Sequence, residues 1–387
     1  MKYEVFWKNP GYKVRPELKE DIECDYLIVG GGVAGVSLAY FLSKKTNKKI
    51  VLIEKNTIAS GATGKAAGTL VLWGEQNIED FVKRHGRKKG FFMWKSIENA
   101  LKNIYAIAKK EKIECEAELQ DILYCGFKHK STYDLYKEYN LLREVDKSSK
   151  ILEGENLKKE INTPLFNHGL FSERKGLSVN PLKFTQNLSR VLDKRKVKVY
   201  ENTSFISKEH NLAHTHQGDI KYRKIIFAID ADHPSEKVQN LKSTLIATRP
   251  LTKKEADFTG LSKKKIIWDA REHYNYFKLT KENRLLVGFG GVIVHKKHKM
   301  TDPHFPHLKQ IKDFTRKLFP YLDLEIEYAW SGHFGVTDHY SPLIEFKGDE
   351  VSIAGASTQV NCVMAADYIS DKLAGRKSKL EPFFNIK

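Results

Sequence analysis

The stretch DYLIVGGGVAGVSLAYFLSKKTNKKIVLIE, residues 25–54, decides the fold. An apolar run of strand length, 25–29, is broken by three consecutive glycines, and apolar residues then resume at helical spacing over 36–43. A second apolar run, 49–53, ends on Glu54. Strand, glycine turn, helix, strand and terminal acid in this order are typical of a dinucleotide-binding βαβ unit.

The spacing Gly30-x-Gly32-x-x-Gly35 has a physical reason. Gly30 permits the tight turn, Gly32 lets the backbone approach a pyrophosphate, and Gly35 lets the helix lie close on the strand. The helix N-terminus offers unpaired N–H groups to the anion. Glu54 can accept both hydroxyls of an adenosine ribose, and an acid there favours a ribose without a phosphate. The alternative is an ordinary strand–helix turn without a ligand.

Composition places the chain among globular proteins. Of its 387 residues, 41% are hydrophobic and 11% aromatic, which excludes a disordered protein. No apolar run approaches the roughly 18 residues of a membrane span, and the first residues do not begin a signal peptide. The four cysteines are scattered without metal-like spacing, so we expect buried thiols, no metal site and a cytoplasmic protein.

The net charge of +18 raises the possibility of nucleic-acid binding, because clustered Lys and Arg release counterions from phosphates. The basic residues come in short groups along the chain, such as 87–89, 263–265 and 296–297. Solvated faces explain this scatter better, and nucleic-acid binding stays as an alternative.

The segment TIASGATGKAAG, residues 57–68, has only small side chains apart from Ile58 and Lys65. A loop of this kind, next to a nucleotide-binding unit, can pass close to a flat cofactor with its N–H groups facing an anion or ring. The alternative is an ordinary flexible loop.

The rest of the chain predicts alternating helices and strands, and from about residue 243 an antiparallel sheet. Residues 1–23 read as an aromatic arm packed on the body. Asn180 and Pro181 predict a helix start, as N-cap and first helical residue. We expect helices over 77–112, 132–145, 181–192, 308–318 and 359–373, and strands over 118–127, 197–200, 224–229, 244–248, 265–269, 274–280, 284–289, 324–330 and 351–355.

These motifs together resemble the D-amino-acid oxidase superfamily of FAD-dependent oxidoreductases. The resemblance rests on DYLIVGGGVAGVSLAYFL…VLIEK, ASGATGKAAG, GLSVNPLKF, IIFAIDA and WSGHFGVTDHYSPLIE…VSIAGAS, and runs from about residue 24 to 375. The segments YEVFW, YNYFKLTKENRLLVGFGG and YAWSGHFGVTD are most similar to gamma-glutamylputrescine oxidoreductase and its relatives.

The resemblance implies an α/β fold with two discontinuous domains. A Rossmann-like FAD-binding domain of the GR2 type would comprise residues 1–80, 150–235 and 335–387. A mainly antiparallel substrate domain would comprise part of 81–149 and 236–334, with its sheet roofing the flavin.

It also implies FAD as cofactor, with the glycine turn on the pyrophosphate, Glu54 on the ribose and the backbone of Phe205 near the adenine. Ala228 would lie at the loop crossing near the cofactor. The full set of implied cofactor-binding residues is Gly30, Gly32, Val33, Ala34, Gly35, Glu54, Lys55, Ser60, Ala62, Thr63, Lys65, Ala67, Gly68, Phe205, Ala228, Gly355, Ser357, Thr358, Gln359 and Val360.

The chain departs from this family at three places near the flavin. Residues 65–68 read Lys-Ala-Ala-Gly where relatives commonly have Arg-Asn-Gly-Gly, and 357–360 read Ser-Thr-Gln-Val where relatives have Ser-Gly-His-Gly. The segment His333-Phe334 lacks the arginine that members acting on free amino acids often place there. Its absence argues against a small free amino acid as substrate, unless Arg249, Arg271 or Lys278 substitutes for it.

Tyr274, Tyr276 and Lys278 alternate along one predicted strand, so they share a face. If that face roofs the flavin, the tyrosines shape an amine pocket, and Lys278 fixes an acidic group or assists oxygen. We expect Tyr276, Lys278 and His333 as catalytic residues, and Tyr274 and Arg249 as substrate-binding ones. The alternatives are a solvent-facing or packed face for the strand, and a structural role for His333.

The leading functional hypothesis is oxidation of an amine or N-substituted amino acid by hydride transfer from the carbon next to nitrogen to flavin N5, followed by imine hydrolysis. Oxygen or another acceptor would reoxidise the flavin. A flavin-dependent tRNA-modification enzyme and a non-catalytic flavoprotein binding subunit are the alternatives.

Overall fold

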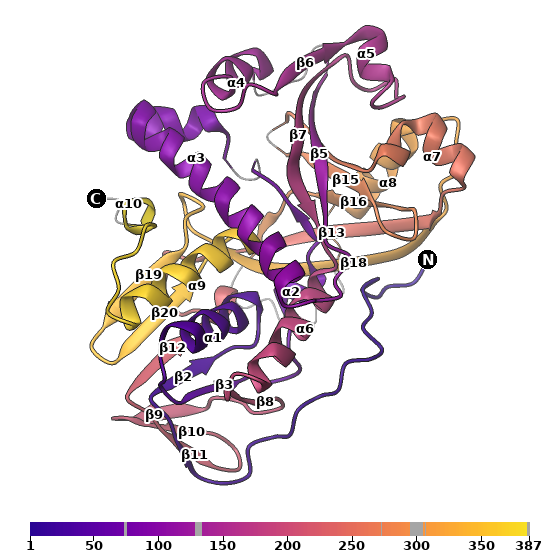
Figure 1. The fold of residues 1–387 in the computed structure, drawn as a ribbon. Coiled ribbons are helices and arrows are strands. Elements are labelled where there is room, and N and C mark those ends of the chain that lie inside the picture. Colours follow the sequence, from indigo (N-terminus) through magenta and orange to yellow (C-terminus); the bar gives the residue numbers. More distant parts are fainter. Residues whose placement is uncertain (73–75, 128–133, 272, 295–304, 306, 385–387) are drawn as a thin grey trace.

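The computed structural model of the protein describes residues 1–72, 76–127, 134–271, 273–294, 305 and 307–384. Within these residues the strands form three sheets, of six, ten and four strands (Figure 1). The two larger sheets carry helices, and the chain has the α/β fold that the glycine turn predicts.

The six-stranded sheet has the order β19-β20-β12-β2-β3-β8. It is parallel except for β19, which pairs antiparallel with β20 at the edge. The predicted strand, turn, helix and strand at its centre are confirmed. The sheet's strands are β2 (Tyr26–Val29), β3 (Ile50–Ile53), β8 (Lys198–Tyr200), β12 (Lys224–Phe227), β19 (Leu343–Lys347) and β20 (Glu350–Ala354).

Three helices stand next to this sheet. Helix α1 (Val33–Lys45) packs against α9 (Gln359–Leu373) and α6 (Pro181–Asp193). The predicted start of α6 is confirmed, because the Asn180 side chain accepts a hydrogen bond from Lys183 N at 3.1 Å and Pro181 is the first helical residue.

The ten-stranded sheet follows the path β17-β13-β16-β15-β14-β5-β7-β4, with β18 paired to β13 and β6 paired to β7. Its neighbours are antiparallel except for β14 and β5. The four predicted strands after residue 243 are confirmed. The sheet's strands are β4 (Thr69–Leu70), β5 (Glu118–Gly126), β6 (Lys150–Glu153), β7 (His168–Ser178), β13 (Gln239–Pro250), β14 (Lys265–Asp269), β15 (Asn275–Leu279), β16 (Arg284–Phe289), β17 (Val292–Val294) and β18 (Ile326–Val336).

The remaining elements lie outside the two larger sheets and the three helices named above. The predicted loop over 57–68 contains a helical turn, α2, and the long helix α3 bends at Gly86, which has φ 75°. Helix α4 begins later than predicted, and residues 132–133 of that prediction lie outside the described residues, as do 296–297 of the basic groups. These elements are α2 (Ala62–Lys65), α3 (Ile78–Lys110), α4 (Leu135–Leu142), α5 (Gly154–Lys158), α7 (Lys253–Thr259), α8 (Leu308–Leu318), α10 (Glu381–Phe384), the 3₁₀ turns η1 (Asp230–Asp232) and η2 (Leu261–Lys263), and the four-stranded sheet of β1 (Ile22–Glu23), β11 (Asp219–Lys221), β10 (Leu212–His214) and β9 (Ser207–Glu209).

The sheet pairing bears on the expected domain boundaries. Residues 150–178 were expected in the FAD-binding domain, but β6 and β7 pair inside the ten-stranded sheet. The two-domain division stays a proposal, and we move its second boundary from 150 to about 179, the start of the segment that leads into α6.

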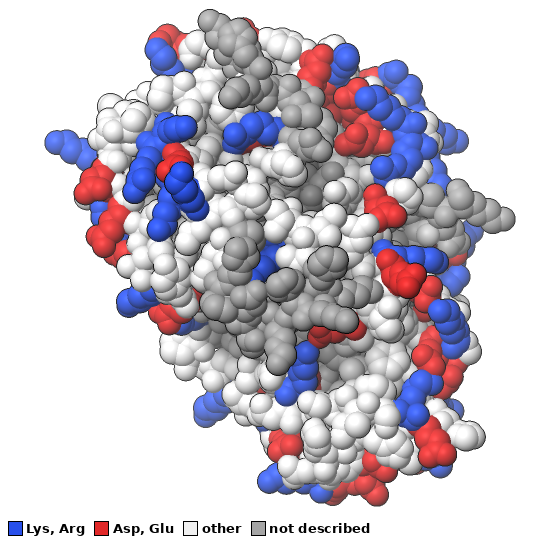
Figure 2. All heavy atoms as spheres, turned by 180° about the vertical axis from the view of Figure 1, so that it is seen from behind, with Lys and Arg blue, Asp and Glu red and all other residues white. Residues whose placement is uncertain are grey.

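The surface charge is mixed on the face seen in Figure 2, where Lys and Arg are interspersed with Asp and Glu near the edges. This scatter agrees with solvated faces better than with one continuous basic surface. Among the described helices, none has the length and apolar character needed to cross a bilayer.

Candidate functional site

A cavity of about 1140 Å³ lies between the six-stranded and ten-stranded sheets. The carboxyl ends of β2, β3 and β12 border it, which is the edge where parallel sheets bind ligands. Most predicted site residues line it: Gly30, Gly32, Val33, Ala34, Glu54, Lys55, Ser60, Ala62, Thr63, Lys65, Ala67, Gly68, Phe205, Ala228, Tyr274, Tyr276, His333, Ser357, Thr358, Gln359 and Val360.

The glycine turn has the geometry that its spacing predicts. Gly30 has φ +111°, and a Cβ there would lie 2.4 Å from Ala228 O. A Cβ on Gly35 would lie 2.0 Å from Gly30 O, so only glycine lets α1 approach the turn. Gly35 itself does not line the cavity, because it faces the strand. Gly32 caps α1 without a side-chain hydrogen bond of its own. Val33 N donates to Thr63 Oγ1 at 3.0 Å, and the N–H groups of Ala34 and Gly35 remain for an anion.

Glu54 also holds the turn together. Its carboxylate accepts hydrogen bonds from Gly31 N at 2.7 Å and from Asn56 N at 2.9 Å. A carboxylate has about four acceptor positions, so two remain for ribose hydroxyls. The structure adds a structural role for Glu54 to the predicted one.

The segment before α9 contributes a buried hydroxyl to the cavity wall. Ser357 has φ +59°, a backbone conformation that residues with a side chain rarely adopt. Ser357 Oγ is buried, borders the cavity and has no hydrogen-bond partner among the described residues. Gly355, with φ +60°, packs against Thr337 behind the cavity instead of lining it.

The roof of the cavity is a row of side chains across the ten-stranded sheet. Tyr276 pairs with Trp268 of β14 on one side and with Gly288 of β16 on the other. A Cβ on Gly288 would lie 2.1 Å from the Tyr276 ring, so this glycine makes room for the ring. The ring of Tyr274 lies 6.1 Å from that of Tyr276. The shared face of Tyr274, Tyr276 and Lys278 is confirmed, because Phe277 packs in the core on the other side.

Sequence reasoning missed Trp268, Phe289 and Asp230, which also line the cavity. The alternation of Ile266 and Trp268 along β14 is a signal that could have revealed the first of these. Asp230 directly follows the predicted strand 224–229, which places it at the carboxyl edge of the sheet. Its contacts with Gly335 and Gly355 could not be predicted, because they join separate segments of the chain.

Two predicted positions need correction, because neither side chain lines the cavity. Lys278 Nζ is buried behind the loop of residues 57–68 and donates to Gly68 O at 2.6 Å and to Ser178 Oγ at 2.7 Å. Arg249 lies at the far end of β13, where Glu255 binds its guanidinium at 2.6 and 3.0 Å. The third proposed substitute for the missing arginine, Arg271, pairs with Asp269 and lies over the Phe127 ring.

His333 borders the cavity and is 4% exposed. Alternation along β18 puts it on the face of Ala329, opposite Trp330 and Phe334. This favours the structural alternative for His333 over a catalytic role.

Asp230 joins the ends of β12, β18 and β20. Its φ is +48°, and its carboxylate accepts a hydrogen bond from Gly335 N at 3.1 Å. Burial raises the pKa of this carboxyl to about 6, although N–H donors of Gly335, Ala231 and Gly355 favour the charged form.

Asp230→Asn should therefore change how stability depends on pH. Between the unfolded pKa of about 3.9 and about 6, the folded protein binds more protons than the unfolded chain, so Asp230 makes stability fall as pH rises. We expect the variant to gain about 1 kcal/mol relative to wild type between about pH 5 and about pH 7.5. Urea unfolding at both pH values measures this, and an equal difference at the two would contradict it.

These features fit the FAD that the family resemblance implies. The turn at Gly30, the N-terminus of α1 and the unsatisfied Ser357 Oγ border the same cavity. One end of the cavity carries Glu54 and Phe205, and the aromatic roof covers another part. The cavity exceeds the size of ordinary small-ligand pockets, as an extended dinucleotide requires.

Comparisons with known proteins agree with this fit. The model of the family described as FAD dependent oxidoreductase (DAO) matches residues 25–370. Gamma-glutamylputrescine oxidoreductase of Escherichia coli (strain K12) is 25% identical over 390 residues, 95% of this chain and 88% of that protein. A protein of Bacillus subtilis (strain 168) named for a Rieske 2Fe-2S centre is 24% identical over 204 residues, 52% of this chain and 38% of that protein. Glycine oxidase from Geobacillus kaustophilus superposes with a TM-score of 0.77 at 16% identity, covering 94% of this chain and 100% of that one.

Proposed function

This chain belongs to the FAD dependent oxidoreductase (DAO) family, and on that premise we propose that it oxidises an amine or N-substituted amino acid at the carbon next to nitrogen. The observation that carries the proposal is the aromatic roof of Trp268, Tyr274 and Tyr276 over the cavity that fits FAD. The name of the E. coli relative, an oxidoreductase of a substituted putrescine, supports the same substrate class.

The roof suits a cationic amine better than a free amino acid. Aromatic faces attract ammonium groups, whereas a free α-carboxylate needs a paired cation when desolvated. Arg249, Arg271 and Lys278 are all engaged elsewhere, and within the described residues no arginine lines the cavity. We therefore propose a polyamine-like or N-alkyl substrate whose oxidised carbon carries no free carboxylate.

FAD, when bound, supplies the acceptor for the hydride that leaves this carbon. The chain's own part is to orient the amine under the aromatic rings, exclude water and take up a proton. A substrate ammonium must become neutral before hydride loss, because the nitrogen lone pair stabilises the developing cation. Lys65 stands at the cavity wall, where burial lowers its pKa and so favours its neutral amine more than in a solvated lysine.

Flavin absorbance under nitrogen tests the proposal. Purified protein with FAD is mixed with polyamines, N-methyl amino acids and free amino acids in separate samples. We expect the flavin absorbance to bleach with polyamines, which carry no carboxylate, and to stay unchanged with glycine. A protein whose flavin is reduced by dithionite but by no amine would contradict amine oxidation, and protein that binds no FAD would contradict the cofactor as well.

A further inference from the structure

The N-terminal arm, residues 1–23, lies outside the predicted cofactor-binding residues, yet it contacts the cofactor loop, residues 57–68, directly. It runs along the outside of the molecule from β18 toward the four-stranded sheet (Figure 1). The predicted packing of its aromatic residues on the body holds for Trp7, which is 4% exposed. Its contacts reach both ends of the loop.

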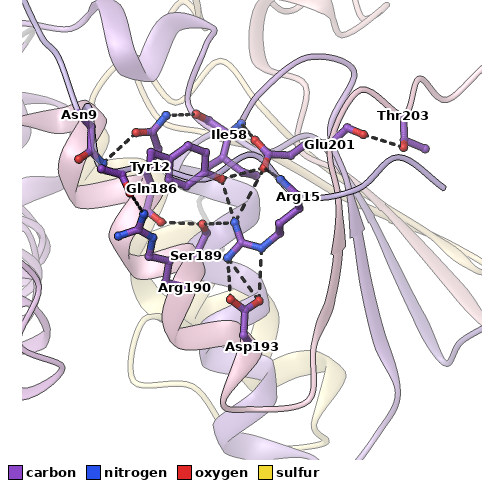
Figure 3. A network of polar contacts seen from close by, with 11 residues as sticks. Asn9, Tyr12, Arg15, Ile58, Gln186, Ser189, Arg190, Asp193, Glu201 and Thr203 are labelled. Carbon is purple, nitrogen blue, oxygen red and sulfur yellow. Dashed lines mark hydrogen bonds and ion pairs between the residues drawn. The ribbon is translucent and has the colours of Figure 1, made fainter.

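The first contact is made through Glu201, whose side chain is fully buried. One carboxylate oxygen accepts a hydrogen bond from Ile58 N at 2.6 Å. The other accepts from the Tyr12 hydroxyl at 2.9 Å and from Arg15 N at 2.6 Å (Figure 3). One buried carboxylate thus links the arm to the start of the loop.

Gln186 makes a second connection between the arm and Ile58. Its side-chain N–H donates to Ile58 O at 3.1 Å, and its side-chain oxygen accepts from Asn9 at 3.0 Å (Figure 3). Both backbone polar groups of Ile58 are therefore held by side chains that the arm itself contacts.

The second contact is at the other end of the loop, where Trp7 Nε1 donates to Ala66 O at 2.8 Å. In a trans peptide the C=O and the next N–H point in opposite directions, so the Ala67 N–H points away from Trp7. Ala67 is buried and lines the cavity, and its N–H donates to no acceptor among the described residues. A buried N–H of this kind requires a partner, which a bound ligand can supply.

We propose that the N-terminal arm is a positioning element of the cofactor site, in which Trp7 directs the Ala67 N–H toward the flavin. The links from Tyr12 and Arg15 to Glu201 fix the other end of the loop. This inference rests on the proposed function, since it presumes FAD in the cavity. The arm supplies orientation only, and the loop backbone makes the contact with the cofactor.

Trp330 provides a matched comparison. Its Nε1 donates to Lys65 O at the same distance, 2.8 Å, and it packs in the same small cluster as Trp7 and Ala67. The N–H opposite that carbonyl, on Ala66, is already bonded to Thr63 O at 3.3 Å. Loss of the Trp330 hydrogen bond therefore does not change the direction of an N–H group that a ligand in the cavity could use.

The experiment compares Trp7→Phe with Trp330→Phe. Each variant keeps an aromatic ring and loses one indole N–H donor. We expect Trp7→Phe to raise the Kd for FAD about tenfold and to shift the visible absorbance bands of the bound flavin. Trp330→Phe should raise the Kd by less than about threefold and leave the bands in place, with both variants measured by recovery of flavin fluorescence.

Equal effects of the two substitutions would overturn the inference, because loss of packing or of a loop hydrogen bond alone predicts equality. If Trp7→Phe does not fold, Tyr12→Phe tests the contact with Glu201 instead. We expect this variant to raise the Kd for FAD about threefold, and an unchanged Kd would contradict the inference. Wild-type protein that binds no FAD would instead overturn the proposed function.

Discussion

Gly35→Ala is expected to abolish FAD binding at micromolar cofactor, because the new Cβ would lie 2.0 Å from Gly30 O. The obstacle is backbone, so α1 must move away from the turn that cradles the pyrophosphate. Overpacking of this kind costs typically up to about 3 kcal/mol, which corresponds to on the order of 100-fold in affinity if it falls on the bound state. The flavin spectrum of purified protein and its fluorescence titration measure the loss.

Ser43→Ala on the same helix is the control for this substitution. Ser43 lies at the opposite end of α1, and its hydroxyl donates to Tyr40 O at 2.8 Å. We expect its FAD affinity to match wild type and its free energy of unfolding to change by less than about 0.5 kcal/mol. If Gly35→Ala bound FAD as tightly as this control, the close approach of α1 to the turn would not matter for the cofactor.

The parts of the fold that short-range patterns encode were predictable. The unit of β2, α1 and β3 follows from residues 25–54 alone, because the glycines, the apolar spacing and the final acid are neighbours in sequence. The start of α6 follows from Asn180 and Pro181 for the same reason. Strands β14, β15 and β16 were predicted because the alternation of side chains along each strand can be recognised without knowing which strand it pairs with.

What escaped prediction depends on long-range pairing. Strands β9, β10 and β11 are three residues each, and β9 is fully exposed, so no apolar alternation marks it. The face of the strand on which Lys278 lies was predictable. The position of its Nζ was not, because it is set by a hydrogen bond to Gly68 O, 210 residues away in the sequence. Arg249 was predicted to bind substrate because the sequence indicated a strand of only 244–248. The observed strand β13 extends to Pro250 and carries Arg249 away from the cavity.

The same limit applies to the arm. Trp7 and Ala66 are 59 residues apart, and Ile58 and Glu201 are 143 apart. No local pattern distinguishes a tryptophan that holds a cofactor loop from one that only fills the core. The sequence indicated packing of the arm, and the hydrogen bonds turned that packing into a hypothesis about the cofactor.

Glu54→Ala is expected to weaken FAD binding on the order of 100-fold, because hydrogen bonds to charged groups contribute about 1.5–3 kcal/mol each. The structure shows the bonds to Gly31 N and Asn56 N, whereas the bonds to the ribose remain a prediction.

An FAD analogue without the adenosine 2′-hydroxyl separates the two roles of Glu54. If Glu54 binds the ribose, the analogue should bind wild type about tenfold more weakly than FAD does, and the Glu54→Ala variant should bind both alike. If Glu54 only holds the turn, removing the hydroxyl should weaken binding to both proteins equally. Fluorescence titration of four protein–ligand pairs gives this cycle, and its coupling energy decides whether the acid after β3 reads the nucleotide or only shapes the turn beneath it.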